Sequence, residues 1–250
     1  MRDIATILKE VEKLKHYSWP SRVRPELERA TYFIYSTPTY EECLRRAHEA
    51  SARTGIPLHV VKEYALARWY NFWTTEALYL SLKDNPLIRM APEKKDKFKD
   101  MFIGHQAFDL KIMSLSASVS RREFDRLVEN PLELIRTLEE GQSRARYHRA
   151  TKLYLLVEVR DKSGKRMPHI AWREKKNIGV LKKALELYAV KLAESGYALP
   201  AVRCYAQGEE FVSRSDVIIL MKTDGKYSCI LYRWKKTGGP EKITVELAGA

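Results

Sequence analysis

The chain has 250 residues, of which 45% are hydrophobic, enough for the packed core of one large domain. Its 45 Lys and Arg residues exceed its 32 Asp and Glu residues, and the formal net charge of +13 favours a polyanionic partner, with nucleic acid ahead of an anionic membrane surface. The three cysteines lack the paired spacing of a zinc site or a disulfide framework, and there is no secretion signal or run of roughly 18 apolar residues, so we expect free thiols, no membrane span and a cytoplasmic location.

The N-terminal segment is expected to be a helical arm. Residues 3 to 15 have the apolar spacing of a short amphipathic helix, and Pro20, Pro25 and Pro38 interrupt the stretch that follows. We therefore treat residues 1 to 38 as the arm. The remainder, residues 39 to 250, is expected to form a single domain.

Two helices follow the arm. The first begins at Tyr40 and ends at Gly55, a residue that commonly caps helices, and the second runs from about residue 57 to about residue 83. Aromatic residues cover most of the circumference of the second helix, at positions 69, 70, 72, 73 and 79. This distribution predicts a helix buried on more than one side, either in the core or at the seam of a dimer.

The stretch DMFIGHQAFDLKIMS, Asp100 to Ser114, predicts a β-hairpin with the two-residue turn Gly104-His105. Counting outward from this turn pairs Asp100 with Asp109. Strand alternation divides the side chains between two faces, with Met101, Ile103, Phe108, Leu110 and Ile112 on one face and Asp100, Asp109 and Lys111 on the other. We expect the first face to be core and the second to carry chemistry.

The rest of the chain mixes helices and strands. We expect a helical region from about residue 121 to 149, interrupted near Asn130-Pro131 and Gly141, and then a buried strand at residues 154 to 159. Another helix at about 174 to 195 and a hairpin that turns at Asp224-Gly225 follow. This order predicts an α/β fold with a mixed central sheet flanked by helices.

The acidic face of the first hairpin suggests a metal site. Opposed residues have Cβ atoms roughly 4.5 to 5.5 Å apart, so Asp100 and Asp109 repel each other unless something compensates. Two carboxylates from adjacent strands suit a partly hydrated Mg²⁺, and Lys111 on the same face can hold or help to deprotonate a water beside phosphorus. The alternative is structural, with Lys111 bridging two acids, because an acid two residues before a lysine also occurs elsewhere in this chain.

The hairpin sequence KDMFIGHQAFDLK, with a helix before it and a helix and strand after it, resembles the PD-(D/E)XK nucleases, which have the restriction-endonuclease-like fold. The resemblance covers roughly residues 57 to 160. It implies that Asp100 and Asp109 are the two acids of the motif and that Lys111 is its lysine. Lys99 stands where the family name has proline.

The resemblance also implies a ligand set and a cofactor. An acid from the preceding helix often joins the metal shell in such nucleases, and Glu76 is the candidate here; the alternative is a solvated helix residue. Asp100, Asp109 and Glu76 would then hold Mg²⁺, for which Mn²⁺ could substitute, and Lys111 would complete the catalytic set.

Basic residues near this site are the candidates for contacts with DNA. On a helix, Gln142, Arg146 and Arg149 share one face and Arg144 lies a step round it. With Arg121 and Arg122, they are expected to bind backbone phosphates, and one arginine could read a guanine. The alternative is a solvated cationic helix end. The polar stretch Ser213 to Ser215 is a weaker candidate for reaching base edges.

These features predict a Mg²⁺-dependent endonuclease that acts on double-stranded DNA. The short chain has no helicase, methylase or ATP-binding motif, so the resemblance favours a type II restriction enzyme, for which a homodimer is expected. Two alternatives stay open: a structure-directed repair or junction nuclease, and a DNA-binding regulator without catalysis, in which residues 40 to 84 form a helix-turn-helix.

Overall fold

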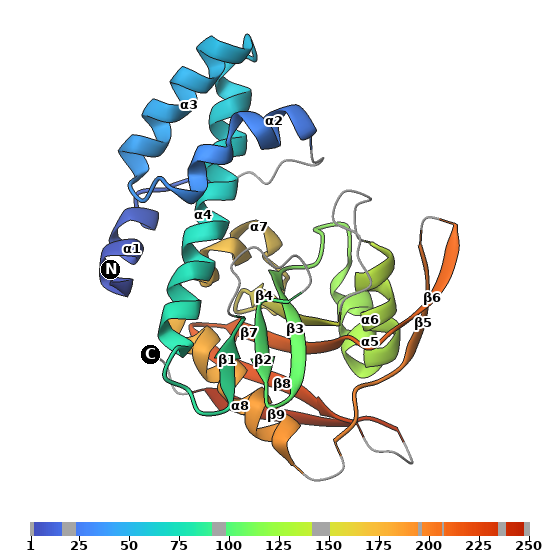
Figure 1. Cartoon of the computed structure of the whole chain (residues 1–250). Coiled ribbons are helices and arrows are strands. Elements are labelled where there is room, and N and C mark those ends of the chain that lie inside the picture. Colours follow the sequence, from blue (N-terminus) through green and yellow to red (C-terminus); the bar gives the residue numbers. More distant parts are fainter. Residues whose placement is uncertain are drawn as a thin grey trace. The chain divides into compact units, whose positions relative to one another are not determined.

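The computed structural model describes residues 3 to 16, 24 to 91, 99 to 141, 151 to 194, 197 to 206, 208 to 234 and 239 to 247 (Figure 1). The chain divides into two compact units, Met1–Ser81 and Leu82–Ala250. The boundary expected from the sequence lay after residue 38, so the two helices that follow the arm group with it instead. In the described ranges, no helix is both long enough and apolar enough to cross a membrane.

The first unit is helical. Its elements are α1 (Ile4–Val11), α2 (Pro25–Ala30), the 3-10 helix η1 (Tyr32–Tyr35), α3 (Tyr40–Thr54) and α4 (Leu58–Leu82), whose last residue belongs to the second unit. Thr39 caps α3 by accepting a hydrogen bond from the Glu42 amide, and Gly55 ends this helix at a φ of 70°, as its sequence predicts.

The aromatic face of α4 explains why the arm and the helices form one unit. Trp69 and Trp73 are buried, and both indole N–H groups donate to the Thr37 carbonyl, at 2.7 and 2.8 Å. Arg68 is buried as well and donates to the Thr31 hydroxyl at 2.6 Å. These contacts join α4 to the segment between α2 and α3, so the predicted core role of the aromatic helix is confirmed.

The second unit is built on a seven-stranded mixed sheet. Its strands, in spatial order, are β1 (Ile88–Met90), β2 (Met101–Ile103), β3 (Gln106–Met113), β4 (Lys152–Arg160), β7 (Asp216–Thr223), β8 (Lys226–Arg233) and β9 (Glu241–Leu247). The three central strands β3, β4 and β7 are parallel, and the outer pairs are antiparallel. The predicted α/β fold class, with a mixed central sheet, flanking helices and an N-terminal helical region, is confirmed.

Helices cover both faces of this sheet (Figure 1). They are α5 (Arg121–Glu129) and α6 (Pro131–Glu140) on one face and α8 (Ile178–Ala193) on the other, with α7 (Pro168–Ala171) and the 3-10 helix η3 (Trp172–Lys176) between β4 and α8. Phe124 and Leu134 pack in one core cluster with Tyr154 and Leu156 of β4. On the opposite face, the ring of Phe108 meets that of Tyr188 at 6.0 Å.

A separate two-stranded hairpin, β5 (Val202–Ala206) and β6 (Glu209–Ser213), packs against α6. Alternate residues of β5 are buried, and Arg136 of α6 donates to the Arg203 carbonyl at 3.0 Å. The sequence did not predict this hairpin. It did predict the break between α5 and α6 at Asn130, the strand β4, and the β7–β8 hairpin, whose turn residues Asp224 and Gly225 have φ values of 49° and 79°.

A buried ion pair fixes the connection between β3 and α5. The guanidinium group of Arg166 donates to both carboxylate oxygens of Glu158, at 2.7 and 3.1 Å. It also donates to the carbonyls of Leu115 and Ser116, at 3.4 and 3.3 Å. It donates to the Val119 carbonyl as well. Because one guanidinium group binds a carboxylate and three backbone oxygens, this connection is held without regular secondary structure.

Gly104→Ala should destabilise the protein by about 1 kcal/mol, because Gly104 has a φ of 58° that an L side chain adopts at a cost. Open space surrounds the position of the added Cβ, so the strain is confined to the backbone. Gly239→Ala is the matched control, with open space and no positive φ. Urea unfolding measures both free energies; equal losses in the two variants would contradict the assigned turn.

Candidate functional site

The hairpin of β2 and β3 has the register that the sequence predicts. Met101 pairs with Phe108 and Ile103 with Gln106, which leaves Gly104 and His105 as the turn. The paired residues end at Met101 and Phe108, and the Asp100 amide, directly before Met101, donates to the Phe108 carbonyl at 2.8 Å. The carboxylate of Asp100 also accepts a hydrogen bond from the Leu110 amide at 2.9 Å, which fixes its orientation against β3.

The two faces of this hairpin differ as expected. Met101, Ile103 and Phe108 are buried on the core face. On the other face Asp109 is only 4% exposed, although it is a carboxylate. The ammonium group of Lys111 lies 2.7 Å from each oxygen of Asp109. The side chain of Lys111 keeps 37% of its surface exposed, so one end of this acidic face is open to solvent.

The acids of the site are crowded. Burial, the charge of Asp109 and a hydrogen bond with Asp109 together raise the pKa of Asp100 to about 6. The Leu110 amide and the Lys111 charge oppose this rise. The Asp100 carboxyl therefore takes up a proton at a higher pH than an ordinary aspartate, because a second acid lies beside it in a partly buried position.

This crowding matches what a divalent cation relieves. Mg²⁺ prefers oxygen ligands and keeps several of its waters, so two carboxylates from adjacent strands can suffice. Among the residues that the structure describes, no group of three or more His, Cys, Asp and Glu side chains has an arrangement suited to a metal ion. The residues of the hairpin that could hold such an ion are Asp100 and Asp109, with solvent or substrate oxygens as further ligands.

Glu76, the expected third acid, lies on α4 and is half-buried. It belongs to the first compact unit, whereas the hairpin belongs to the second. Its part in the metal site stays a prediction.

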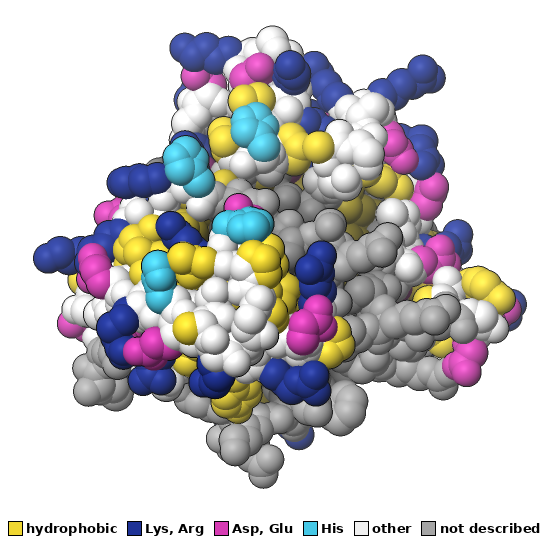
Figure 2. Space-filling view, turned by 90° about the horizontal axis from the view of Figure 1, so that it is seen from above, with side chains coloured by type: hydrophobic (Ala, Val, Ile, Leu, Met, Phe, Trp, Pro, Cys, Tyr) yellow, Lys and Arg dark blue, Asp and Glu magenta, His cyan; other side chains and the backbone are white. Residues whose placement is uncertain are grey.

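The expected DNA contacts divide into two groups. Gln142, Arg144, Arg146 and Arg149 lie outside the described residues. Arg121 and Arg122 are exposed in the first turn of α5, and Arg121 donates to the Ser163 carbonyl at 3.2 Å. On the described part of the face in Figure 2, Lys and Arg side chains are interspersed with Asp and Glu. The roles of all six residues stay predictions.

The expectation for Ser213 and Ser215 was wrong. Both are buried, and their hydroxyls donate to Glu139 instead of pointing outward to bases. Glu139 also pairs with the buried Lys152 at 2.9 Å. Sequence reasoning missed this cluster because it began the strand at residue 154. In the structure β4 begins at Lys152, and this lysine pairs with Asp109 of β3.

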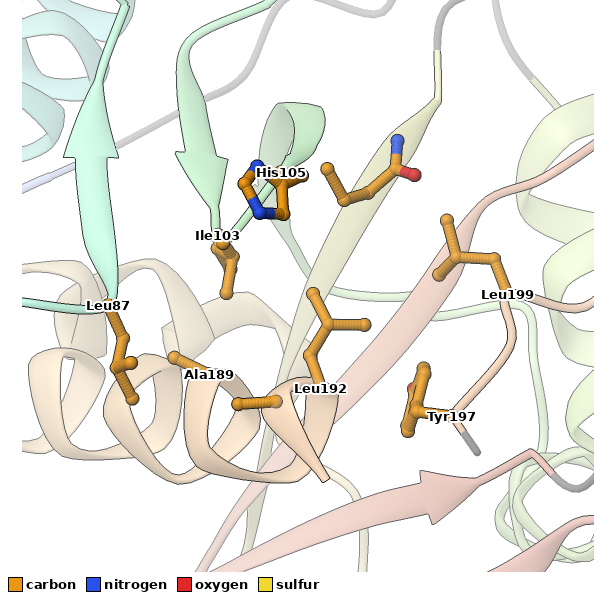
Figure 3. A pocket seen from close by; sticks show the side chains of 10 residues that line it. Leu87, Ile103, His105, Ala189, Leu192, Tyr197 and Leu199 are labelled. Atoms are coloured by element: carbon orange, nitrogen blue, oxygen red, sulfur yellow. The ribbon is translucent and has the colours of Figure 1, made fainter. Parts of the chain in front are cut away.

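A cavity of about 490 Å³ lies at the tip of the same hairpin (Figure 3). Ile103 and His105 line it from the hairpin, Leu192 from α8, and Tyr197 from the segment before β5. Ile103 belongs to the core face, opposite the acidic face. The described residues around this cavity include no carboxylate, so it is distinct from the Asp100 and Asp109 site.

Comparisons of the chain with protein-family models, with curated proteins and with solved structures find no match.

Asp100→Asn should stabilise the protein at pH 8 in the presence of EDTA. Because folding raises the pKa of Asp100 from 3.8 to about 6, the folded state holds a proton that the unfolded chain has released. The free energy of unfolding therefore falls as the pH rises from about 4 to about 6 and stays low above that range. Asparagine avoids this loss, so we expect a gain of roughly 1 to 3 kcal/mol at pH 8 that vanishes near pH 4.

Denaturant unfolding at pH 4, 6 and 8 measures this gain. Asp161→Asn is the control with the opposite sign, because hydrogen bonds from Ser163 and Lys165 lower the pKa of Asp161. The Asp161→Asn substitution, which removes this carboxylate, should not stabilise the protein at pH 8. A pH-independent difference between Asp100→Asn and the parent would contradict the crowded pair.

Proposed function

We propose that the protein is a Mg²⁺-dependent endonuclease that cleaves double-stranded DNA. The observation that carries the proposal is the close pair of acids, the half-buried Asp100 and the buried Asp109, with Lys111 held beside Asp109 at the solvent-exposed end of the face. A crowded acid pair that is partly removed from water is costly for a fold, and such perturbed groups gather at functional sites.

The side chains of this site have separable tasks. Asp109 orients the Lys111 ammonium, which lies 2.7 Å from both of its oxygens. Lys111 can donate a hydrogen bond to a phosphate oxygen or to the attacking water, since it has three donors and is partly exposed. Asp100 and Asp109 would hold the cation. When bound, Mg²⁺ supplies the positive charge that stabilises the transition state and acidifies a water.

The sheet around the site supports the resemblance to PD-(D/E)XK nucleases. An antiparallel meander β1 to β3 carries the two acids and the lysine, and the crossover through α5 and α6 returns to the parallel strand β4. This is the order of hairpin, helix and strand that the resemblance implies. It favours a nuclease over the non-catalytic regulator, which requires no acid pair.

The charge distribution supports a polyanionic substrate. The second unit holds 33 of the Lys and Arg residues and 22 of the Asp and Glu residues, so nearly all of the net positive charge lies in the unit that contains the acid pair. A positive field attracts DNA and offsets the repulsion between phosphate and carboxylates. A type II restriction enzyme acting as a cytoplasmic homodimer is the form of this activity that we propose.

Cleavage of DNA tests the proposal. Unmethylated phage DNA is incubated with the protein in Mg²⁺ or EDTA, and the ends of the products are sequenced. We expect discrete Mg²⁺-dependent fragments, and losses on the order of 10²-fold or more in Asp109→Asn and Lys111→Met, because each variant removes charge at the reacting phosphate.

The chain offers a matched control. Asp224 and Lys226 have the same spacing as Asp109 and Lys111 but are exposed at the β7–β8 turn. Asp224→Asn and Lys226→Met should cleave like the parent. If linear DNA remains uncut while four-way junctions are cut, the substrate is structural. If both are bound but neither is cut in Mg²⁺, the nuclease proposal fails in favour of a regulator.

A further inference from the structure

The strand beside the candidate metal site carries a buried cation. β3 and β4 are parallel neighbours, and their register sets Asp109 opposite Lys152. The Asp109 amide donates to the Thr151 carbonyl at 2.9 Å, which fixes this register at the site itself. Directly opposed residues of neighbouring strands project to the same face of a sheet, so the side chains of Lys152 and Asp109 project to the same face.

Lys152 is held in a buried cluster of polar side chains. Its side chain is 1% exposed, and its ammonium lies 2.9 Å from Glu139, which is 0% exposed near the end of α6. The other oxygen of Glu139 accepts from the hydroxyls of Ser213 and Ser215. Ser215 in turn accepts from the Lys152 amide at 3.0 Å. The cluster thus joins β4, α6 and the link between β6 and β7.

Stability alone does not account for this cluster. Removing two charges from water costs several kcal/mol per ion, and well-packed apolar residues of similar volume often serve a fold as well or better. A fully satisfied buried pair does, however, fix the geometry of what surrounds it. The residue paired with Lys152 on the neighbouring strand β3 is Asp109. Lys111, also on β3, forms an ion pair with Asp109.

We propose that Lys152, anchored by Glu139, is a positioning residue for the Asp109 carboxylate. Asp109 then lies between two cations, Lys111 along β3 and Lys152 across on β4, and keeps one orientation toward a divalent ion. The inference rests on the proposed function, because it assigns a role toward the same metal site. If so, the affinity for the metal depends on the buried ion pair Lys152–Glu139, although neither residue binds the metal.

Mn²⁺ binding to the full chain, measured by calorimetry, tests this role without any cleavage assay. Glu139→Gln/Lys152→Met removes both charges together, so the net charge of the site is unchanged and a change in affinity reports position. We expect Mn²⁺ to bind about 10- to 100-fold more weakly, the range for groups that orient a metal ligand. Ser213→Ala/Ser215→Ala keeps both charges, removes the hydroxyl contacts to Glu139 and to the Lys152 amide, and should weaken binding less.

A second buried ion pair, whose acid lies on β4, is the control. Glu158→Gln/Arg166→Met also removes a buried carboxylate and cation, but at the other end of β4 from Lys152. It should keep Mn²⁺ affinity within about twofold of the parent even where it lowers the melting temperature.

The possible failures differ. If the parent binds Mn²⁺ and both the Glu139/Lys152 and the Ser213/Ser215 variants bind it equally well, the positioning role is wrong and the proposed function stands. If the control weakens binding as much as they do, the effect is general destabilisation and the role is overturned. A parent that binds no Mn²⁺ overturns the metal site and this inference with it.

Discussion

Electrostatic repulsion between two carboxyl groups is the constraint on which the site depends. Asp100 and Asp109 are adjacent on one face of a short hairpin, and burial and proximity raise the pKa of Asp100 to about 6. Every other feature of the site bears on this repulsion. The Gly104 turn sets the register of the hairpin whose open end carries both acids, the Leu110 amide donates to Asp100, and Lys111 partly neutralises Asp109.

The other buried acids of the second unit show why this pair is unusual. Each has donors in place: Lys152 and two serines for Glu139, Arg166 for Glu158, Lys222 and Tyr227 for Glu174, and Tyr188, Tyr197 and Trp234 for Asp216. Such satisfied groups are ordinary parts of a folded interior. Asp100 instead has another acid as its neighbour. In the proposed site, a cation would supply the positive charge that the other acids receive from protein donors.

Much of this site follows from local rules that a sequence displays. A two-residue turn with glycine first fixes the register of a hairpin, so the pairing of Met101 with Phe108 could be predicted and is confirmed. Alternation then assigns each side chain to a face, and Lys111 contacts Asp109 on its face. Helix ends at Gly55 and Asn130 could be predicted for the same reason, because capping and proline chemistry act within a few residues.

What could not be predicted depends on contacts distant in sequence. Lys152 and Glu139 look like surface charges until β4 is extended and α6 is placed against it. Ser213 and Ser215 look like a polar turn until the β5–β6 hairpin packs on α6. The grouping of the arm with α4 likewise depends on indole hydrogen bonds to Thr37, more than thirty residues away. Such pairings are set by tertiary packing, which outweighs local pattern.

Anomalous diffraction from crystals of the protein grown with Mn²⁺ tests the central claim most directly, because it locates the ion without reference to any substrate. From the proposed metal site we predict one strong anomalous peak within coordination distance of carboxylate oxygens from both Asp100 and Asp109, and no such peak in Asp109→Asn crystals. A protein that binds no Mn²⁺ there, with Lys111 bridging the two acids instead, would contradict it and would make this hairpin a structural element.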